Sequence, residues 1–286
     1  MTDLPGERFD ALLPAEMARR AEEVGVQKAS MDGATTFALA VLAGAFMALG
    51  GVFATTALAG AGAAPGGVAR VLAGLTFSLG LILVVVGGAE LFTGNNLIAM
   101  AWASGRISTG ALARNWGIVF AGNFLGATAT AFVVFLGGSY RFGGGAFGIA
   151  ALDVARAKLE LGFGQAVALG VLCNALVCLA VWLAFSARTT ADRILAVVPP
   201  ISAFVAAGFE HSIANMYFIP FAIFIALDQE FVATLAAGHH AQTLTWAGFL
   251  LRNLLPVTIG NVIGGTLLVG LMYWFVYLRR RGTRRR

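Results

Sequence analysis

The stretch Phe209–Met216, FEHSIANM, decides how the rest of the chain is interpreted. It places an acid, an imidazole and an amide between two apolar runs, ILAVVPPISAFVAAG before it and YFIPFAIFIAL after it. A soluble protein could hide such a cluster in a cleft. In a membrane span, by contrast, an ionisable side chain is costly and indicates a functional site. The first question is therefore whether these runs cross a membrane.

The composition is that of an integral membrane protein. Of the 286 residues, 59% are hydrophobic and 12% are charged, and the mean hydropathy is +0.84. Six segments are long and apolar enough to cross a hydrocarbon core about 30 Å thick. They cover approximately residues 35–60, 71–103, 112–137, 163–185, 194–227 and 250–278. The second and fifth are too long for one ordinary span and contain polar residues, which predicts that both helices are broken.

Lysine and arginine are distributed unevenly about these predicted spans. With both termini on one side, that side carries fourteen of the nineteen Lys and Arg residues. The positive-inside rule then places both termini in the cytoplasm, with the chain in the inner membrane. We expect a cytoplasmic amphipathic segment over residues 1–34, a six-helix channel domain over 35–278 and a basic tail over 279–286. The tail is interpreted as a topology anchor, and no nucleic-acid partner is expected.

Three groups of residues occur twice along the chain in the same order. The first helix of each half carries the pattern F-x-x-A-V-x-x-G, beginning at Phe37 and at Phe163. The second and third segments share the patterns G-x-E-x4-N and R-N-x6-G-N-x2-G, as follows: Gly88, Glu90 and Asn95 with Gly208, Glu210 and Asn215; Arg114, Asn115, Gly122, Asn123 and Gly126 with Arg252, Asn253, Gly260, Asn261 and Gly264. A repeat of three spans crosses the membrane an odd number of times, so the second copy enters the membrane from the opposite side. The sequence therefore predicts two inverted repeats, at about 35–137 and 163–278, with the functional site between them.

The polar interruptions GGAELFTGNN and GFEHSIANM fall at matching places in the two halves. Non-helical backbone in a membrane is tolerated where it is buried in protein or lines a cavity, so the two breaks are predicted to face a pore. Half-helix N-termini there attract anions. Glu90 and Glu210, together with Asn95 and Asn215, are predicted to support the broken helices, the acids by accepting hydrogen bonds from the unwound backbone. Contact with substrate is the alternative role for the two acids.

His211 is the one histidine inside a predicted span. Its imidazole suits a protonatable gate near physiological pH. It could supply a positive charge to a small anion, or give up a proton so that the substrate crosses as a neutral acid. Thr93 offers a hydroxyl from the opposing break and Asn261 an amide from the last helix, and either could hold the imidazole or the anion. For Asn261, helix–helix packing is an equal alternative.

The chain resembles the formate/nitrite transporter family, and within it the formate channels. The stretches that carry the resemblance are AELFTGNNL, ASGRIS, FEHSIANMYFIP and RNLLPVTIGNVIGG, and the similarity runs from about residue 21 to about residue 278. The resemblance implies an all-helical, aquaporin-like fold of six spans. It also implies a homo-pentamer in the lipid bilayer, with one pore in each protomer.

The resemblance also implies roles for individual residues. It places the central pore site on His211, with Thr93 as hydroxyl partner and Asn261 as pore asparagine. It assigns anion attraction in the outer vestibule to Lys158, although the preceding loop departs from the formate-channel pattern. The implied hydrophobic constrictions are Phe77, Leu81, Leu91, Phe92, Val177 and Phe204. Apolar constrictions on either side of a polar centre exclude hydrated ions and admit small neutral acids.

The predicted function is transport of small monovalent weak-acid anions, formate first, with a proton-linked mechanism through His211 as one alternative. Nitrite is the nearest alternative substrate, followed by hydrosulfide and lactate. A neutral-solute channel is disfavoured because the Asn-Pro-Ala pairs of aquaporins are absent from the sequence. A membrane redox subunit would need paired histidines for haem. No enzyme motif, metal-ligand spacing or cofactor motif occurs, so we expect neither catalysis nor a cofactor.

The N-terminal segment PAEMARRAEEV, which begins at Pro14, is predicted to be helical because proline suits the first turn of a helix. Two roles remain open for it. It is either a solvated cytoplasmic helix that helps assembly or, as the resemblance suggests, a movable plug at the inner mouth of the pore.

Overall fold

The computed structural model describes residues 11–61, 65–234 and 244–279, and every regular element in these ranges is helical. The first half contains α1 (Pro14–Ser30), α2 (Gly33–Leu58), α3 (Gly66–Gly87), η2 (Gly94–Ile98), α4 (Ala99–Ala103), α5 (Thr109–Leu136) and η3 (Ser139–Arg141). The second contains α6 (Ala146–Leu159), α7 (Phe163–Ser186), α8 (Thr190–Ala206), α9 (Ser212–Ile225), α10 (Gln229–Ala233), α11 (Trp246–Gly248), η5 (Phe249–Leu254), α12 (Leu255–Val262), η6 (Ile263–Leu271) and α13 (Met272–Tyr277).

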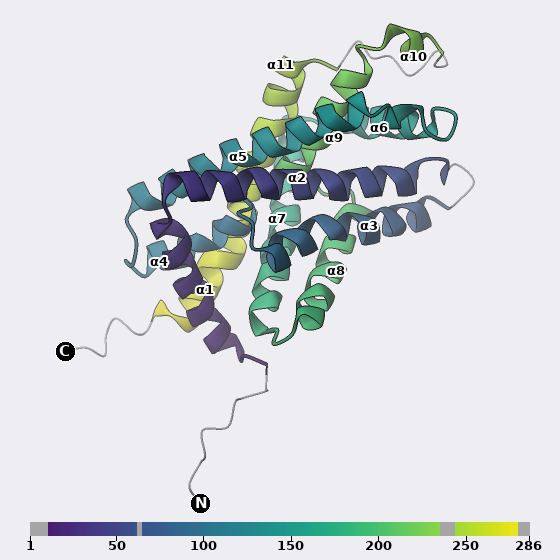
Figure 1. Cartoon of the computed structure of the whole chain (residues 1–286). Helices are drawn as coiled ribbons and strands as arrows, with labels where there is room; N and C mark the ends of the chain where they lie inside the picture. The colour runs from purple at the N-terminus through teal and green to yellow at the C-terminus, as the bar shows by residue number, and fades with distance from the viewer. Residues whose placement is uncertain (1–10, 62–64, 235–243, 280–286) are drawn as a thin grey trace, which may run out of the picture.

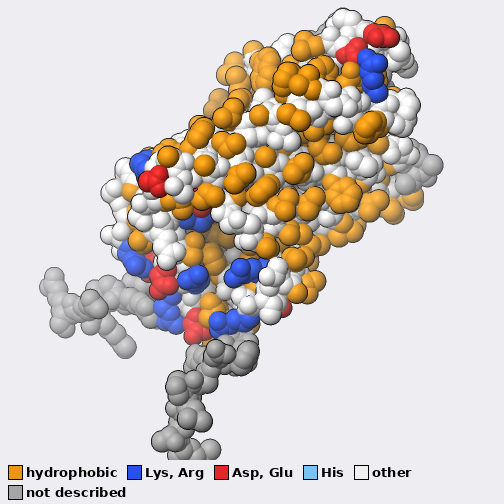
Figure 2. All heavy atoms as spheres, viewed as in Figure 1, with side chains coloured by type: hydrophobic (Ala, Val, Ile, Leu, Met, Phe, Trp, Pro, Cys, Tyr) orange, Lys and Arg blue, Asp and Glu red, His pale blue; other side chains and the backbone are white. Residues whose placement is uncertain are grey.

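Five helical runs among the described residues are long and apolar enough to cross a membrane. They are α2, α3, α5, α7 and the continuous run Trp246–Tyr277 from α11 to α13. In Figure 1, α2, α3 and α5 lie side by side, and α1 lies at the opposite end of the molecule from α10. Figure 2 shows hydrophobic side chains spread over the middle of one face, with charged side chains at its two ends. This distribution is that of a membrane-embedded helical protein.

The sequence predicted six long spans, but the described residues contain only five helical runs of membrane length. The difference arises because the fifth predicted segment is divided into two shorter helices. Residues 194–227 form α8 and α9, of 17 and 14 residues, separated by a non-helical turn. The second predicted segment is divided as well, into α3 and the short helices η2 and α4. Both breaks therefore occur at the predicted places, and each leaves half-helices that are shorter than the segment from which they were predicted.

Each break begins with a glycine in the left-handed backbone region. Gly88 has a φ of 78° and follows α3, and Gly208 has a φ of 73° and follows α8. A residue with a Cβ atom is strained in this conformation, whereas glycine is not. The chain then extends away from the helix, and the N–H groups of Glu90 and Glu210 donate to the carbonyls of Leu39 and Leu169 at 3.2 and 3.3 Å.

Small residues bring α2 close to α5, and α7 close to α12 and η6. The Cα of Gly126 lies against the carbonyl of Val41, and that of Gly264 against the carbonyl of Val171, with no room for a side chain at either glycine. Close backbone approach of this kind is the usual form of helix packing in membranes. The contacts pair Val41 with Val171, whereas the sequence comparison aligned Val41 with Val167. The sequence match of the first helices was therefore wrong by four residues, about one helical turn.

Two segments outside the long helices form defined helices. The N-terminal segment is helical from Pro14, as predicted, and α1 packs against η2, α4 and α13 instead of extending into solvent. Met17 and Ala18 of α1 are buried in a cluster with Trp182 of α7 and Leu278. The helix α6 was not predicted, because it lies in the connection between two predicted spans. It packs on α9 and carries Lys158 into the molecule.

Candidate functional site

His211 and Thr93, one from each break, form a buried pair. The Nε2 atom of His211 lies 3.0 Å from the hydroxyl oxygen of Thr93. His211 is also the residue that caps the N-terminus of α9, where its Nδ1 atom accepts a hydrogen bond from the N–H of Ala214 at 3.0 Å. An acceptor nitrogen carries no proton, so the remaining ring proton of a neutral imidazole lies on Nε2 and points toward Thr93.

The carbonyl of Thr93 is fixed by two side chains from α7. Asn174 Nδ2 and Cys178 Sγ each donate to this carbonyl at 3.3 Å. The same amide of Asn174 donates to the carbonyl of Asn261 at 2.7 Å and to Oδ1 of Asn96 at 2.8 Å. Sequence reasoning did not find Asn174. The signal available was an asparagine in the middle of an apolar helix, where an amide needs partners.

Asn261 supports the second break and does not contact His211. Its Oδ1 accepts from the N–H of Ser212 at 2.9 Å, and its Nδ2 donates to the carbonyls of Gly170 and Glu210, both at 2.9 Å. Of the two partners proposed for the imidazole, only Thr93 is therefore found. Asn123 makes the same three kinds of contact in the first break, with the N–H of Phe92 and the carbonyls of Ala40 and Glu90.

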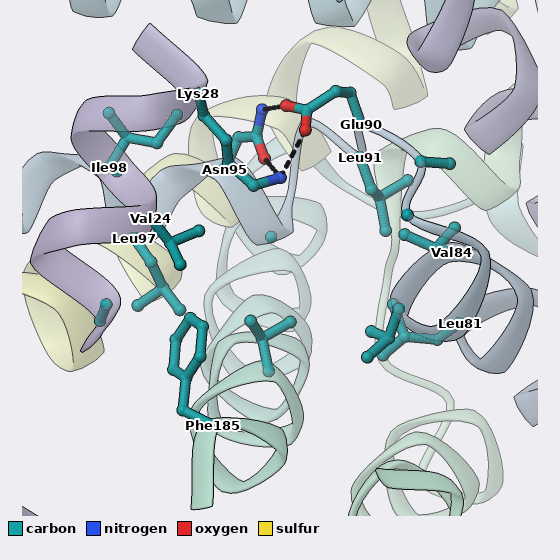
Figure 3. Close-up of a pocket in the computed structure, with 17 residues that line it drawn as sticks. Val24, Lys28, Leu81, Val84, Glu90, Leu91, Asn95, Leu97, Ile98 and Phe185 are labelled. Carbon is teal, nitrogen blue, oxygen red and sulfur yellow. Dashed lines mark hydrogen bonds and ion pairs between the residues drawn. The ribbon is translucent and has the colours of Figure 1, made fainter. Parts of the chain in front are cut away.

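The carboxylates of Glu90 and Glu210 were expected to accept from the unwound backbone, and this expectation was wrong. Glu90 accepts instead from the ammonium of Lys28 at 2.7 Å and from the amide of Asn95 at 2.7 Å (Figure 3). Glu210 accepts from Lys158 at 2.8 Å and from Asn215 at 2.7 Å. The backbone of each break already has the asparagine of the third helix as its partner, and the acids bind side chains that reach the break.

Two clusters of four residues thus repeat the same interactions. Each contains a lysine, a glutamate and two asparagines, and the second asparagine donates to the carbonyl of the lysine. The clusters are Lys28, Glu90, Asn95 and Asn115, and Lys158, Glu210, Asn215 and Asn253. Sequence reasoning counted Lys28 only as a topology charge, because it lies outside the predicted first span. The correspondence between Lys28 and Lys158 is visible only once α1 and α6 are seen to pack on the two breaks.

Two cavities approach the histidine–threonine pair. The α6 cavity, of about 590 Å³, is lined by residues of α3, α6 and α8 and includes Lys158 and His211. The α1 cavity, of about 230 Å³, includes Lys28, and Leu91 and Gly94 line it on either side of Thr93 in the chain (Figure 3). The pair therefore lies between a cavity that reaches His211 and a cavity that reaches the neighbours of Thr93.

Apolar side chains border both cavities. Phe77 and Phe204 line the α6 cavity, with ring centroids 5.9 Å apart, and the ring of Phe204 stacks on that of His211 at 5.8 Å. Leu81 and Leu91 line the α1 cavity. The other two residues assigned to the constrictions, Phe92 and Val177, are buried but are not among the residues that line these two cavities. The ring of Phe92 packs against Phe120, with centroids 5.0 Å apart.

The site is built for hydrogen bonding and offers no ligand set for a metal. Among the described residues, no three His, Cys, Asp or Glu side chains are grouped so that they could hold a metal ion. The donors at the site are the Nε2–H of His211, which points at the hydroxyl oxygen of Thr93, and the hydroxyl of Thr93 itself, and both residues are buried. Such an arrangement can hydrogen-bond a small acceptor molecule.

Comparison with known proteins identifies the family. The family model described as "formate/nitrite transporter" matches residues 15–275 of this chain. The chain belongs to the formate/nitrite transporter family. It is therefore a transport protein of the inner membrane and not an enzyme.

Individual relatives cover nearly the whole chain. It is 48% identical to the formate channel FocA of Escherichia coli K12, covering 95% of this chain and 96% of the relative. It is 38% identical to the formate channel FocA of Haemophilus influenzae, covering 91% and 93%. A solved structure described as a pentameric formate channel with formate bound is 44% identical, with a TM-score of 0.81, and covers 86% of this chain and 98% of that one.

Proposed function

We propose that the chain is a channel for small monovalent weak-acid anions and that formate is its main substrate. The observation that carries this proposal is the buried pair of Thr93 and His211 between two cavities, each of which is lined by a lysine. The names of the relatives support formate in particular. Nitrite is the alternative, because it is a bent three-atom anion of similar size. Hydrosulfide and lactate follow.

The structure of the pair suggests how an anion is received. Moving a unit charge into a dry passage costs several kcal/mol, so the anion needs donors at the point where it loses its water. We propose that the Nε2–H of His211 and the hydroxyl of Thr93 are these donors, and that both act from the neutral state. Proton transfer from His211 to the anion is the alternative. It requires a second proton on Nδ1, which would break the hydrogen bond from Ala214.

The remaining predictions about architecture are part of the same proposal. We propose two inverted repeats, at about residues 35–137 and 163–278, which together contribute six membrane-crossing segments. The paired hydrogen bonds of Asn123 and Asn261 support this repeat. We propose further that both termini are cytoplasmic, so that the α1 cavity opens inward. In this arrangement α1 covers the inner mouth of the pore, with Val24 in the cavity wall.

We also propose that the protein is a pentamer with a pore in each protomer. Its many exposed apolar side chains need either lipid or neighbouring protomers, and a related solved structure is described as pentameric. Native mass spectrometry of the detergent-solubilised protein should give five chains per particle. A monomer or tetramer under mild conditions contradicts the proposed assembly.

The test of substrate is a panel of solutes applied to proteoliposomes that contain the protein. Formate should enter fastest, with nitrite next, and excess nitrite should slow formate entry because both use one pore. Lactate and hydrosulfide complete the panel. Nitrite entry well above formate entry would move the chain to nitrite transport, and lack of competition would mean that the two anions do not share a site.

A further inference from the structure

We propose that Arg70 is the residue that first binds the anion at the mouth of the α6 cavity, and that it favours planar anions with two oxygens. The inference rests on the proposed anion transport and adds a binding residue to it. Arg70 lies near the N-terminus of α3, is exposed, and lines the cavity that includes His211. Neither the sequence motifs nor the break clusters include it.

The charge of Lys158 is already balanced within the protein. Its ammonium lies 2.8 Å from Glu210, and the side chains of the two residues are only 14% and 5% exposed. The α6 cavity has one other carboxylate in its lining, Asp153, which lies 3.7 Å from Arg156 on its own helix. Both acids of the cavity wall therefore have cationic neighbours other than Arg70. Of the two cations that line this cavity, Lys158 is paired with Glu210, so Arg70 is the one that can bind an approaching anion.

Arg70 itself makes no hydrogen bond or ion pair with any of the residues that the structure describes. A Cβ atom added to Gly208 would lie 4.0 Å from a terminal nitrogen of its guanidinium. Gly208 begins the second break, three residues before His211. The guanidinium of Arg70 therefore lies near the break that carries His211. Phe77 follows Arg70 by seven residues, two helical turns, and lines the same cavity about 10 Å farther along α3.

The chemistry of the guanidinium gives it selectivity that a lysine lacks. Its planar fork of N–H groups binds two oxygens of a carboxylate side by side. Formate and nitrite both offer two oxygens on one atom, whereas hydrosulfide offers a single sulfur. A cation at a cavity mouth also raises the local concentration of anions, an effect that salt weakens. Arg70 is thus expected to act on capture and discrimination, before the constriction at Phe77.

The α1 cavity has no equivalent of Arg70. Among the residues that line it, the one cation is Lys28, which is 2.7 Å from Glu90. The α6 cavity therefore has a guanidinium that can bind an anion, and the α1 cavity has none.

The experiment compares Arg70→Gln, Arg70→Lys and the control Arg252→Gln with the wild-type protein in proteoliposomes. Arg252 is also an exposed cation and lies near the end of α6, but it does not line the α6 cavity. We expect Arg70→Gln to raise the KM for formate entry by roughly 3- to 10-fold and to leave the maximal rate of entry unchanged. The reason is that binding of formate at the cavity mouth weakens, whereas the constriction at Phe77 is intact. The difference should shrink at high ionic strength. Arg252→Gln should behave like the wild type.

Arg70→Lys separates charge from geometry. We expect it to retain most of the charge effect on KM but to lose preference for formate over hydrosulfide. A wild-type KM in Arg70→Gln, or an equal rise in Arg252→Gln, would overturn the proposal. An unchanged formate-to-hydrosulfide preference in Arg70→Lys would overturn its bidentate part. Failure of the proposed function itself is distinct, because wild-type vesicles would then show no formate entry.

Discussion

At the scale of single residues, His211 has two roles that a substitution can separate. Its Nδ1 caps α9 through Ala214, and its Nε2 faces Thr93. In His211→Asn, the shorter side chain can still cap the helix, since asparagine is a favoured N-cap residue, but it loses the ring nitrogen that faces Thr93. We therefore expect a folded, assembled protein whose formate entry falls by about tenfold or more. Loss of the pH dependence as well would favour the alternative, proton transfer from His211.

Formate entry into proteoliposomes across a pH series measures this prediction. Thr93→Val is the matched variant at the other side of the pair, because it removes the hydroxyl at nearly constant volume and should show a milder defect. Wild-type entry and wild-type pH response in His211→Asn would make the imidazole a structural cap only.

Asn174 is predicted to position Thr93. Replacement by alanine leaves the carbonyls of Thr93 and Asn261 without the amide that joins them, and each unpaired buried group costs about 1–3 kcal/mol. Asn174→Ala should therefore lower the melting temperature and slow formate entry together. Cys178→Ala is the control, because it removes one weak donor to the same carbonyl. The positioning role fails if Asn174→Ala melts and transports like Cys178→Ala.

At the scale of helices and loops, close packing between α2 and α5 depends on glycine. In Gly126→Ala, the new methyl group would overlap the carbonyl of Val41, and overpacking of this kind typically costs about 1–3 kcal/mol. We expect less assembled protein and a lower melting temperature. Gly117→Ala, in the same helix with nothing near the added methyl, should leave both unchanged. Equal behaviour of the two variants in a thermal-shift measurement would contradict the packing.

The connection after α9 is tied to η3 by an ionic cluster with a defined pH dependence. The hydroxyl of Tyr140, the N–H of Phe231 and the guanidinium of Arg141 all donate to Asp228 and hold the pKa of its carboxyl well below the usual range. A depressed pKa means that the stabilisation is present at neutral pH and is lost as pH falls through the folded-state value.

Asp228→Asn should therefore melt below the wild type at pH 7, and the gap should narrow as the pH is lowered toward 3. Melting temperatures measured at a series of pH values give the comparison. A gap that widens in acid would mean that Asp228 does not contribute as a carboxylate.

The sequence predicted the elements better than their contacts. The polar stretches GGAELFTGNN and GFEHSIANM predicted both breaks, because non-helical backbone in a membrane is tolerated where it is buried in protein or lines a cavity. The pairing of Thr93 with His211 also followed from the two breaks. What sequence could not supply was the role of Lys28, which lies 62 residues from Glu90 in the chain, because that contact depends on how α1 docks. The sequence comparison also matched the first helices of the two halves one turn out of register, because their register is defined by contacts with the third helices.

At the scale of the whole molecule, the larger of two cavities reaches His211, and the smaller reaches the chain neighbours of Thr93, its hydrogen-bond partner. A water-filled pore for neutral solutes would need a continuous polar lining. A pore for weak-acid anions needs cations at its mouths, dry constrictions and donors between them. The arrangement of Arg70, Lys28, Phe77, Leu81 and His211 corresponds to the second design.

The most direct measurement of this account is light scattering by proteoliposomes after rapid mixing with formate or with glycerol. We predict fast swelling in formate and swelling no faster than protein-free vesicles in glycerol, because the barrier passes the small weak acid and excludes the larger neutral solute. Fast glycerol entry without formate entry would contradict the account and make the chain a neutral-solute channel.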